Sequence, residues 1–198
     1  MGTRGLYGFR KNGVDKTTYN HFDSYPDCLG WAIAQFCAEN PEPEMDKMFD
    51  MIEMVSESGK PTKAEIMFCV ENDLCDTGVS SGRVEDWYCL LRNIQGDLKR
   101  LGAIIRKHGK AYMIDNSGFI KDSLWCEYAY IINLDTHKLE FYKGFQKVPD
   151  RGNRYGMGRS RDGFYPCVLV AEIPLCEIKD PDKTVAYMNS LINEDEEE

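Results

Sequence analysis

The sequence predicts a single α+β domain in which a layered sheet of antiparallel or mixed strands packs against helices. Strand-like segments, with alternating or continuous apolar residues, lie at both ends of the chain. Helix-like segments, with apolar residues three and four positions apart, lie mainly between them. The chain has 198 residues, 42% of them hydrophobic, so it is long enough to bury a core of its own.

The first thirty residues predict a β-hairpin followed by a helix. Residues 3–10 and 14–20 have strand character and flank the turn Lys11-Asn12-Gly13. A helix is expected from Ser24 to about residue 38, because Ser24-Tyr25-Pro26-Asp27 has the pattern of a capping box with proline in the first turn.

The middle of the chain predicts two or three further helices. Residues 44–56 and about 83–101 carry apolar stripes at helical spacing. Thr62 and Glu65 form a second capping box, which predicts a helix that begins after Thr62.

The second half predicts strands and one closing helix. Residues 111–114 form a short apolar run, and residues 128–142 predict a hairpin. Residues 167–173 are apolar except for Glu172, and a run of this kind is typical of a central strand. A final helix is expected from about Asp182.

Charge and cysteine content exclude several classes of protein. The net charge of −9 argues against general nucleic-acid binding, because that affinity comes from Lys and Arg that neutralise phosphates. No apolar stretch approaches the ~20 residues of a membrane span, and the first residues lack the pattern of a secretion signal. The eight cysteines form no Cys-x-x-Cys pair, so we expect reduced, mostly buried thiols. These features predict a cytoplasmic protein without membrane association, with one domain over residues 1–193 and a solvated acidic tail over residues 194–198.

Polar side chains of several kinds are concentrated where the first hairpin meets the expected helix: Asn20, His21, Asp23, Ser24 and Tyr25. In a functional interpretation these residues form one site with Thr3 and Arg4, beside a helix N-terminus that suits a carboxylate or phosphate. In a structural interpretation Asp23 or Ser24 only caps the helix, and His21 satisfies a buried partner. The sequence leaves both interpretations open.

A basic, glycine-rich segment spans residues 143–163, where six Lys and Arg residues outnumber Asp150 and Asp162. Such a composition is typical of a lid over an anionic or aromatic ligand, with Arg151, Arg154, Arg159 and Arg161 as the binding residues. The alternative is a solvated loop that balances an acidic body, and in either case we expect its charges to contribute little to stability. The segment is no Walker loop, since Gly-x-x-x-x-Gly-Lys is absent from it.

Four residues were considered as metal ligands: His21, Asp23, His108 and His137. Their spacing is not that of a zinc site. His108 and His137 also lie in segments expected at the surface. We therefore expect no metal and no cofactor.

Two segments resemble a poorly characterised protein family of bacteriophages and prophages. The first is Met1-Gly2-Thr3-Arg4-Gly5 with Tyr19-Asn20-His21-Phe22-Asp23-Ser24-Tyr25-Pro26, and the second is Tyr130–Asp135 with Leu139–Phe145. The resemblance covers most of the chain. It implies no settled activity, and we expect from it a phage-type accessory protein in the host cytoplasm.

The start of the chain is also similar to N-terminal nucleophile hydrolases. In those enzymes a Cys, Ser or Thr at residue one begins a strand, and an Asn or Asp on the neighbouring strand helps to bind the substrate. Thr3 and Asn20-His21-Phe22-Asp23 have this layout, but removal of Met1 would expose Gly2, which has no nucleophilic side chain. The similarity implies a related fold in which the chemistry is lost or changed.

These observations predict a pocket between the first hairpin, the Ser24 helix start and the loop over residues 143–163. Our leading hypothesis is a counter-defence protein that binds a small anionic or nucleotide-like molecule, or a host protein, and thereby interferes with a host process. The alternative is a hydrolase of an amide or related bond, with His21 as general acid or base, Asp23 orienting it and Asn20 stabilising an oxyanion. A third hypothesis is an interaction protein without a small ligand.

Overall fold

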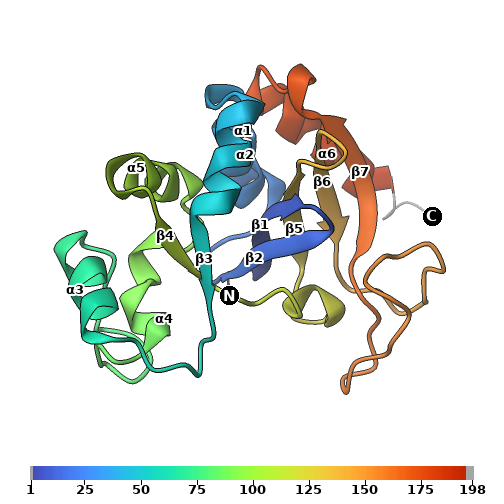
Figure 1. Ribbon diagram of the computed structural model, residues 1–198. Coiled ribbons are helices and arrows are strands. Elements are labelled where there is room, and N and C mark those ends of the chain that lie inside the picture. Colours follow the sequence, from blue (N-terminus) through green and yellow to red (C-terminus); the bar gives the residue numbers. More distant parts are fainter. Residues whose placement is uncertain (1, 195–198) are drawn as a thin grey trace.

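A five-stranded mixed sheet forms the centre of the molecule (Figure 1). The computed structural model describes residues 2–194. The strand order is β2-β1-β5-β6-β7, in which β1 and β5 are parallel and the other neighbours are antiparallel. The strands are β1 (Gly5–Lys11), β2 (Val14–Asn20), β5 (Tyr128–Asn133), β6 (Lys138–Lys143) and β7 (Val168–Pro174).

A second, two-stranded sheet pairs β3 (Ile52–Val55) in parallel with β4 (Ala111–Ile114). The helices are α1 (Trp31–Glu39), α2 (Glu42–Met51), α3 (Lys63–Glu71), α4 (Trp87–Leu90), α5 (Leu98–His108) and α6 (Pro181–Glu194). Short turns of other helix types are η1 (Pro26–Gly30), η2 (Arg92–Ile94), η3 (Phe119–Lys121) and η4 (Leu175–Glu177). The predicted α+β class in a single domain is confirmed, and no helix among residues 2–194 is long and apolar enough to cross a membrane.

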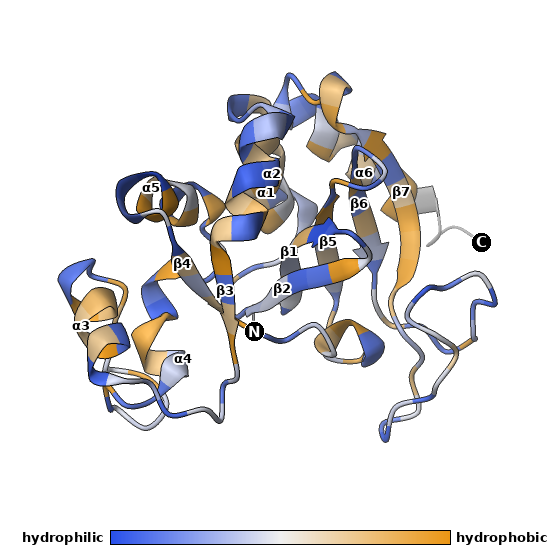
Figure 2. Cartoon of the chain, in the orientation of Figure 1, coloured by the Kyte–Doolittle hydropathy of each residue, from blue (hydrophilic) through white to orange (hydrophobic). Residues whose placement is uncertain are grey.

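The two faces of the large sheet pack against different layers. Because side chains alternate along a strand, Tyr7 and Phe9 of β1 face the helices and join the main core, whereas Leu6 faces the opposite side. There a smaller core lies under η3 and the long loop between β6 and β7, which contributes Tyr155. Figure 2 shows apolar residues along the strands and mostly hydrophilic residues in that loop. None of the eight cysteines forms a disulfide, in line with expectation.

The predicted helix over residues 44–56 is shorter in the structure, because α2 ends at Met51 and the chain continues as β3. Ile52 and Val55 are β-branched residues that are buried when they pair with β4. Lys16 of β2 stabilises the end of α2, since its Nζ donates to the carbonyl oxygens of Phe49 (2.8 Å) and Ile52 (2.6 Å). Tertiary pairing therefore overrides the helical spacing here.

The predicted helix over residues 83–101 is divided into α4, η2 and the start of α5. Gly96 adopts a φ of 76°, a left-handed conformation that interrupts the helix. Asp97 then begins α5, because its carboxylate accepts from the Arg100 N–H at 2.8 Å. The capping box of Thr62 and Glu65 at the start of α3 is confirmed.

The expectation that residues 167–173 form a central strand is wrong, because β7 lies at an edge of the sheet. Ala171 and Ile173 are buried against the main core, whereas Leu169 is 40% exposed. The apolar run thus contains core residues on one face and partly exposed residues on the other. The predicted β5–β6 hairpin is confirmed, and residues 195–198 of the expected acidic tail lie outside the described residues.

Candidate functional site

Ser24 anchors the end of the first hairpin inside the molecule and is fully buried. Its N–H donates to Thr3 Oγ1 at 2.8 Å, and its hydroxyl donates to the Phe22 carbonyl at 3.0 Å. The same hydroxyl accepts from Asn20 Nδ2 at 2.9 Å, and the Ser24 carbonyl accepts from the Tyr130 hydroxyl at 2.9 Å. Ser24 therefore holds the hairpin to the central strand β5 and does not form the expected capping box.

Asn20 is also an internal residue, with 1% of its surface exposed. Its Nδ2 donates to Phe22 O and to Ser24 Oγ, both at 2.9 Å, and its Oδ1 faces Gly96. Gly5 completes this packing, because a Cβ atom there would lie 2.6 Å from the Ser24 Cβ. Asn20, Ser24 and Thr3 thus serve to position the segment between them, and all three are closed to solvent.

Residues His21, Phe22 and Asp23 are exposed as a result, between the buried Asn20 and Ser24. His21 Nδ1 lies 2.9 Å from the Tyr19 hydroxyl, whereas Asp23 lies against Gly2. The structure therefore brings His21 together with Tyr19. It does not bring Asn20, His21 and Asp23 to one cavity.

Two arginines lie on aromatic rings beside His21. The Arg4 guanidinium carbon is 4.8 Å from the centre of the Trp125 ring. The Arg92 guanidinium carbon is 4.3 Å from the centre of the Phe22 ring and 5.6 Å from that of Tyr88. We call this region the Arg4–Arg92 surface, defined by Arg4, Tyr19, His21, Phe22, Arg92 and Trp125.

The Arg4–Arg92 surface is a concentration of positive charge. The guanidinium group of neither arginine forms an ion pair with a carboxylate among residues 2–194, and Arg92 donates to the neutral amide of Gln95 at 2.6 Å. A carboxylate does border the surface, because the Arg4 main-chain N–H donates to Glu127 Oε1 at 3.1 Å. Partial burial lowers the pKa of His21, and the charges of Arg92 and Arg4 lower it further. Burial raises the pKa of Tyr19. At neutral pH the region thus holds two cations, a neutral imidazole and a neutral phenol, but Arg92 is only 8% exposed, so Arg4 is the more accessible cation.

The sequence did not indicate the distant members of this surface. Arg92 comes from η2 and Trp125 from the segment between η3 and β5, so only the fold brings them to residues 4 and 21. Phe22 lies within the polar motif, but a hydrophobic residue is usually expected in the core. In the structure it is 52% exposed, and its ring contacts the Arg92 guanidinium group. Tyr25, which was expected in the site, packs its ring 6.1 Å from that of Tyr128 instead.

Arg154 of the basic loop has a structural role. Its two terminal nitrogens donate to both oxygens of Glu140, at 2.7 and 2.6 Å, and the Glu140 side chain is only 2% exposed. Tyr142 and Asn133 also donate to this carboxylate, at 3.0 and 2.6 Å. Arg154 thereby fastens the loop to the sheet, where it borders a cleft of about 560 Å³.

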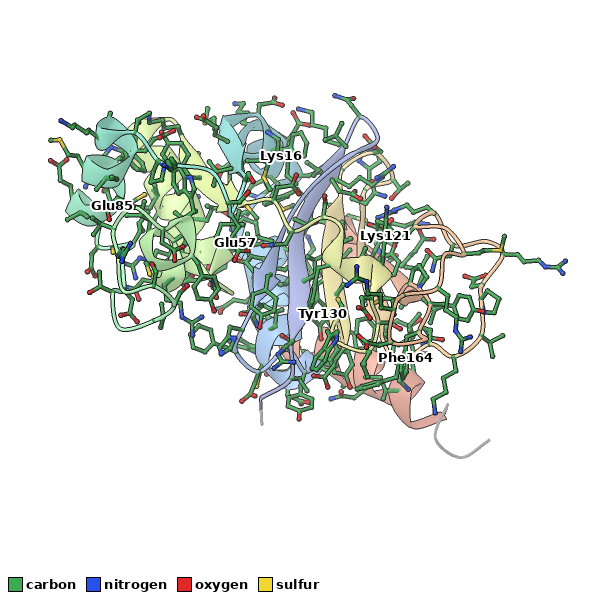
Figure 3. All side chains as sticks on the ribbon, turned by 90° about the horizontal axis from the view of Figure 1, so that it is seen from below. Lys16, Glu57, Glu85, Lys121, Tyr130 and Phe164 are labelled. Atoms are coloured by element: carbon green, nitrogen blue, oxygen red, sulfur yellow. The ribbon has the colours of Figure 1, made fainter. Side chains whose placement is uncertain are left out.

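The other loop arginines differ from Arg154. Arg159 donates to the Gly163 carbonyl at 2.7 Å and so closes the tip of the loop, whereas Arg151 and Arg161 are exposed. The expected pocket between hairpin, helix start and loop is not formed around Arg154, because that residue lies near Arg10 at the far end of β1 from Gly5. In Figure 3, Phe164 and Lys121 lie on the side of the loop, and Tyr130 lies nearer the centre.

Comparison with known proteins finds no match: no protein-family model matches the chain, and no curated protein or solved structure does. Within residues 2–194, no group of three or more His, Cys, Asp or Glu side chains is placed to hold a metal ion. The functional argument therefore rests on the geometry of the Arg4–Arg92 surface.

We predict that Arg154→Ala lowers the free energy of unfolding by roughly 2–4 kcal/mol, because it leaves the buried Glu140 carboxylate without its counter-charge. This corrects the expectation that every loop arginine contributes little to stability. Arg151→Ala, the matched change at an exposed position, should alter stability by less than about 0.5 kcal/mol. Urea unfolding of both variants measures the difference, and equal small effects would contradict the structural role of Arg154.

We also predict that Arg4→Gln and Arg92→Gln each raise the pKa of His21. Removal of a nearby positive charge makes protonation of the imidazole less unfavourable, so the shift must be upward. An NMR titration of the His21 ring resonances measures it, with the exposed Arg83→Gln as the control that leaves the value unchanged. A His21 pKa that does not respond to either variant would show that the two cations do not face this ring.

Proposed function

We propose that this chain is a binding protein that takes a small anionic, nucleotide-like ligand on the Arg4–Arg92 surface. The observation that carries the proposal is that the guanidinium groups of Arg4 and Arg92 each lie on an aromatic ring near a neutral histidine and form no salt bridge among the described residues. The phosphate of the ligand would bind the Arg4 guanidinium, with the charge of the largely buried Arg92 adding to the local field, and its planar ring would stack on the neighbouring aromatic side chains.

The chemistry of arginine supports this choice of ligand. A guanidinium group offers several N–H donors in one plane, which matches the oxygens of a phosphate or carboxylate, and stacking on a ring fixes that plane in advance. Because the whole chain carries a net charge of −9, an anion would be attracted only where cations are concentrated. Neutral His21 adds a ring nitrogen that can donate one hydrogen bond to the same anion.

The hydrolase alternative receives less support from the geometry. Asn20 cannot stabilise an oxyanion from its present position, because its Nδ2 is used by Phe22 O and Ser24 Oγ inside the molecule. Asp23 does not contact His21, whose Nδ1 instead contacts the Tyr19 hydroxyl.

A phage-type accessory protein of this kind would interfere with a host process by binding the ligand in the host cytoplasm, without turnover.

The test uses adenosine 5′-monophosphate (AMP) as the probe, with adenosine and inorganic phosphate as its two halves. We predict that AMP binds more tightly than either half, and that Arg4→Gln weakens AMP binding by about tenfold or more, since a charge-assisted hydrogen bond contributes about 1.5–3 kcal/mol. Isothermal titration calorimetry at low and high salt measures the affinities, and high salt should weaken AMP binding.

The control is Arg83→Gln, which removes the same charge at an exposed position outside the surface. It should leave AMP binding unchanged. The proposal fails if no probe binds, or if Arg4→Gln and Arg83→Gln affect AMP equally.

A further inference from the structure

Trp125 belongs to the Arg4–Arg92 surface and also contacts the long loop. Arg4 lies over the face of the Trp125 ring, and the indole Nε1 of Trp125 donates to Asp162 Oδ2 at 3.1 Å. The ring is 45% exposed, so a ligand can still reach it. The tip of the loop is therefore placed next to the surface, although the loop residue Arg154 is fastened to the other end of the sheet.

The tip of the loop, residues 159–164, is held in one conformation by hydrogen bonds within it. Gly163 donates to the Ser160 carbonyl at 3.1 Å, and Ser160 donates to the Phe164 carbonyl at 2.7 Å. Arg159 closes the same turn by its bond to the Gly163 carbonyl. Arg161, at the centre of this turn, is exposed and makes no hydrogen bond or ion pair with another described residue.

Cations and aromatic rings thus alternate along one path over the protein. The path runs from His21 to Arg4 and then across Trp125 to the loop tip, where Asp162 accepts from the indole N–H and Arg161 is the preceding residue. Arg92, which is only 8% exposed, adds its charge at the His21 end. The indole ring separates Arg4 from the tip. A single phosphate bound to Arg4 would leave Arg161 without an anion. A second phosphate, placed beyond the indole ring, would lie on the same side of that ring as the loop tip that carries Arg161.

On the basis of the proposed function, we infer that the ligand has two separated anionic groups joined to planar rings, as in a linear dinucleotide, and that Arg161 binds the second anion. Trp125 acts as the stacking platform between the two phosphates. Asp162 is a positioning residue, because its bond to Trp125 holds the loop tip beside the ligand. Arg161 therefore sets the preference for a dinucleotide over a mononucleotide.

The experiment compares linear diadenylate with a 5′-phosphate (pApA) against AMP, by calorimetry on the full chain. We predict that pApA binds about tenfold or more tightly than AMP, the value of one charge-assisted hydrogen bond. Arg161→Gln should remove most of this preference and leave AMP affinity within about twofold. Lys147→Gln, which removes an exposed cation elsewhere on the same loop, should leave both affinities unchanged.

Three results would overturn the inference. They are equal affinities for pApA and AMP, an Arg161→Gln variant that keeps the full preference, and a gain for ADP, whose phosphates are adjacent, as large as that for pApA. In each case AMP binding that depends on Arg4 would leave the proposed function intact. If Arg4→Gln does not weaken AMP, the proposed function itself fails.

Discussion

The buried hydrogen bonds of Ser24 are the constraint on which the arrangement of the surface depends. Ser24 connects the chain start through Thr3, the end of β2 through Asn20, and the central strand β5 through Tyr130. Each of these polar groups lies away from water, and a buried group left unpaired costs about 1–3 kcal/mol. The bonds must therefore form together, and residues 21–23, which lie between two buried anchors, are forced outward. Gly5 is part of the same constraint, because any larger residue there would collide with Ser24.

The sequence indicated one segment of the candidate site but not the direction of its side chains. Asn20 and His21 were expected in one site, but side chains alternate along a strand, and in the structure Asn20 faces inward and His21 outward. The hairpins and the Thr62 capping box could be predicted because their signals are local. The break at Gly96 and the strand at Ile52–Val55 could not, because they depend on Asp97 capping and on pairing with residues nearly sixty positions away. The positions of Arg92 and Trp125 in the candidate site could not be predicted either, because they too depend on contacts between residues that are distant in the sequence.

The charge distribution gives the two ends of β1 different roles. Near Arg10, the cations Arg10 and Arg154 are neutralised by Asp15 and Glu140, so that end holds the loop on the sheet. Near Gly5, the guanidinium groups of Arg4 and Arg92 lie on aromatic rings and form no salt bridge among the described residues, and the charge of Arg4, the less buried of the two, remains available. Uncompensated cations on an acidic protein produce a local field that attracts anions and does not hold the fold together. This contrast separates the proposed binding surface from a structural network in a single sheet.

The most direct test of the central claim is native-state hydrogen exchange at the Ser24 amide. That N–H donates to a buried side-chain oxygen, so it should exchange only when the whole domain unfolds, whereas the exposed residues Phe22 and Asp23 should exchange rapidly through local motion. The account predicts a protection free energy at Ser24 close to the global free energy of unfolding. Exchange at Ser24 as fast as at its two exposed neighbours would contradict it, because the segment would then open without disturbing the core.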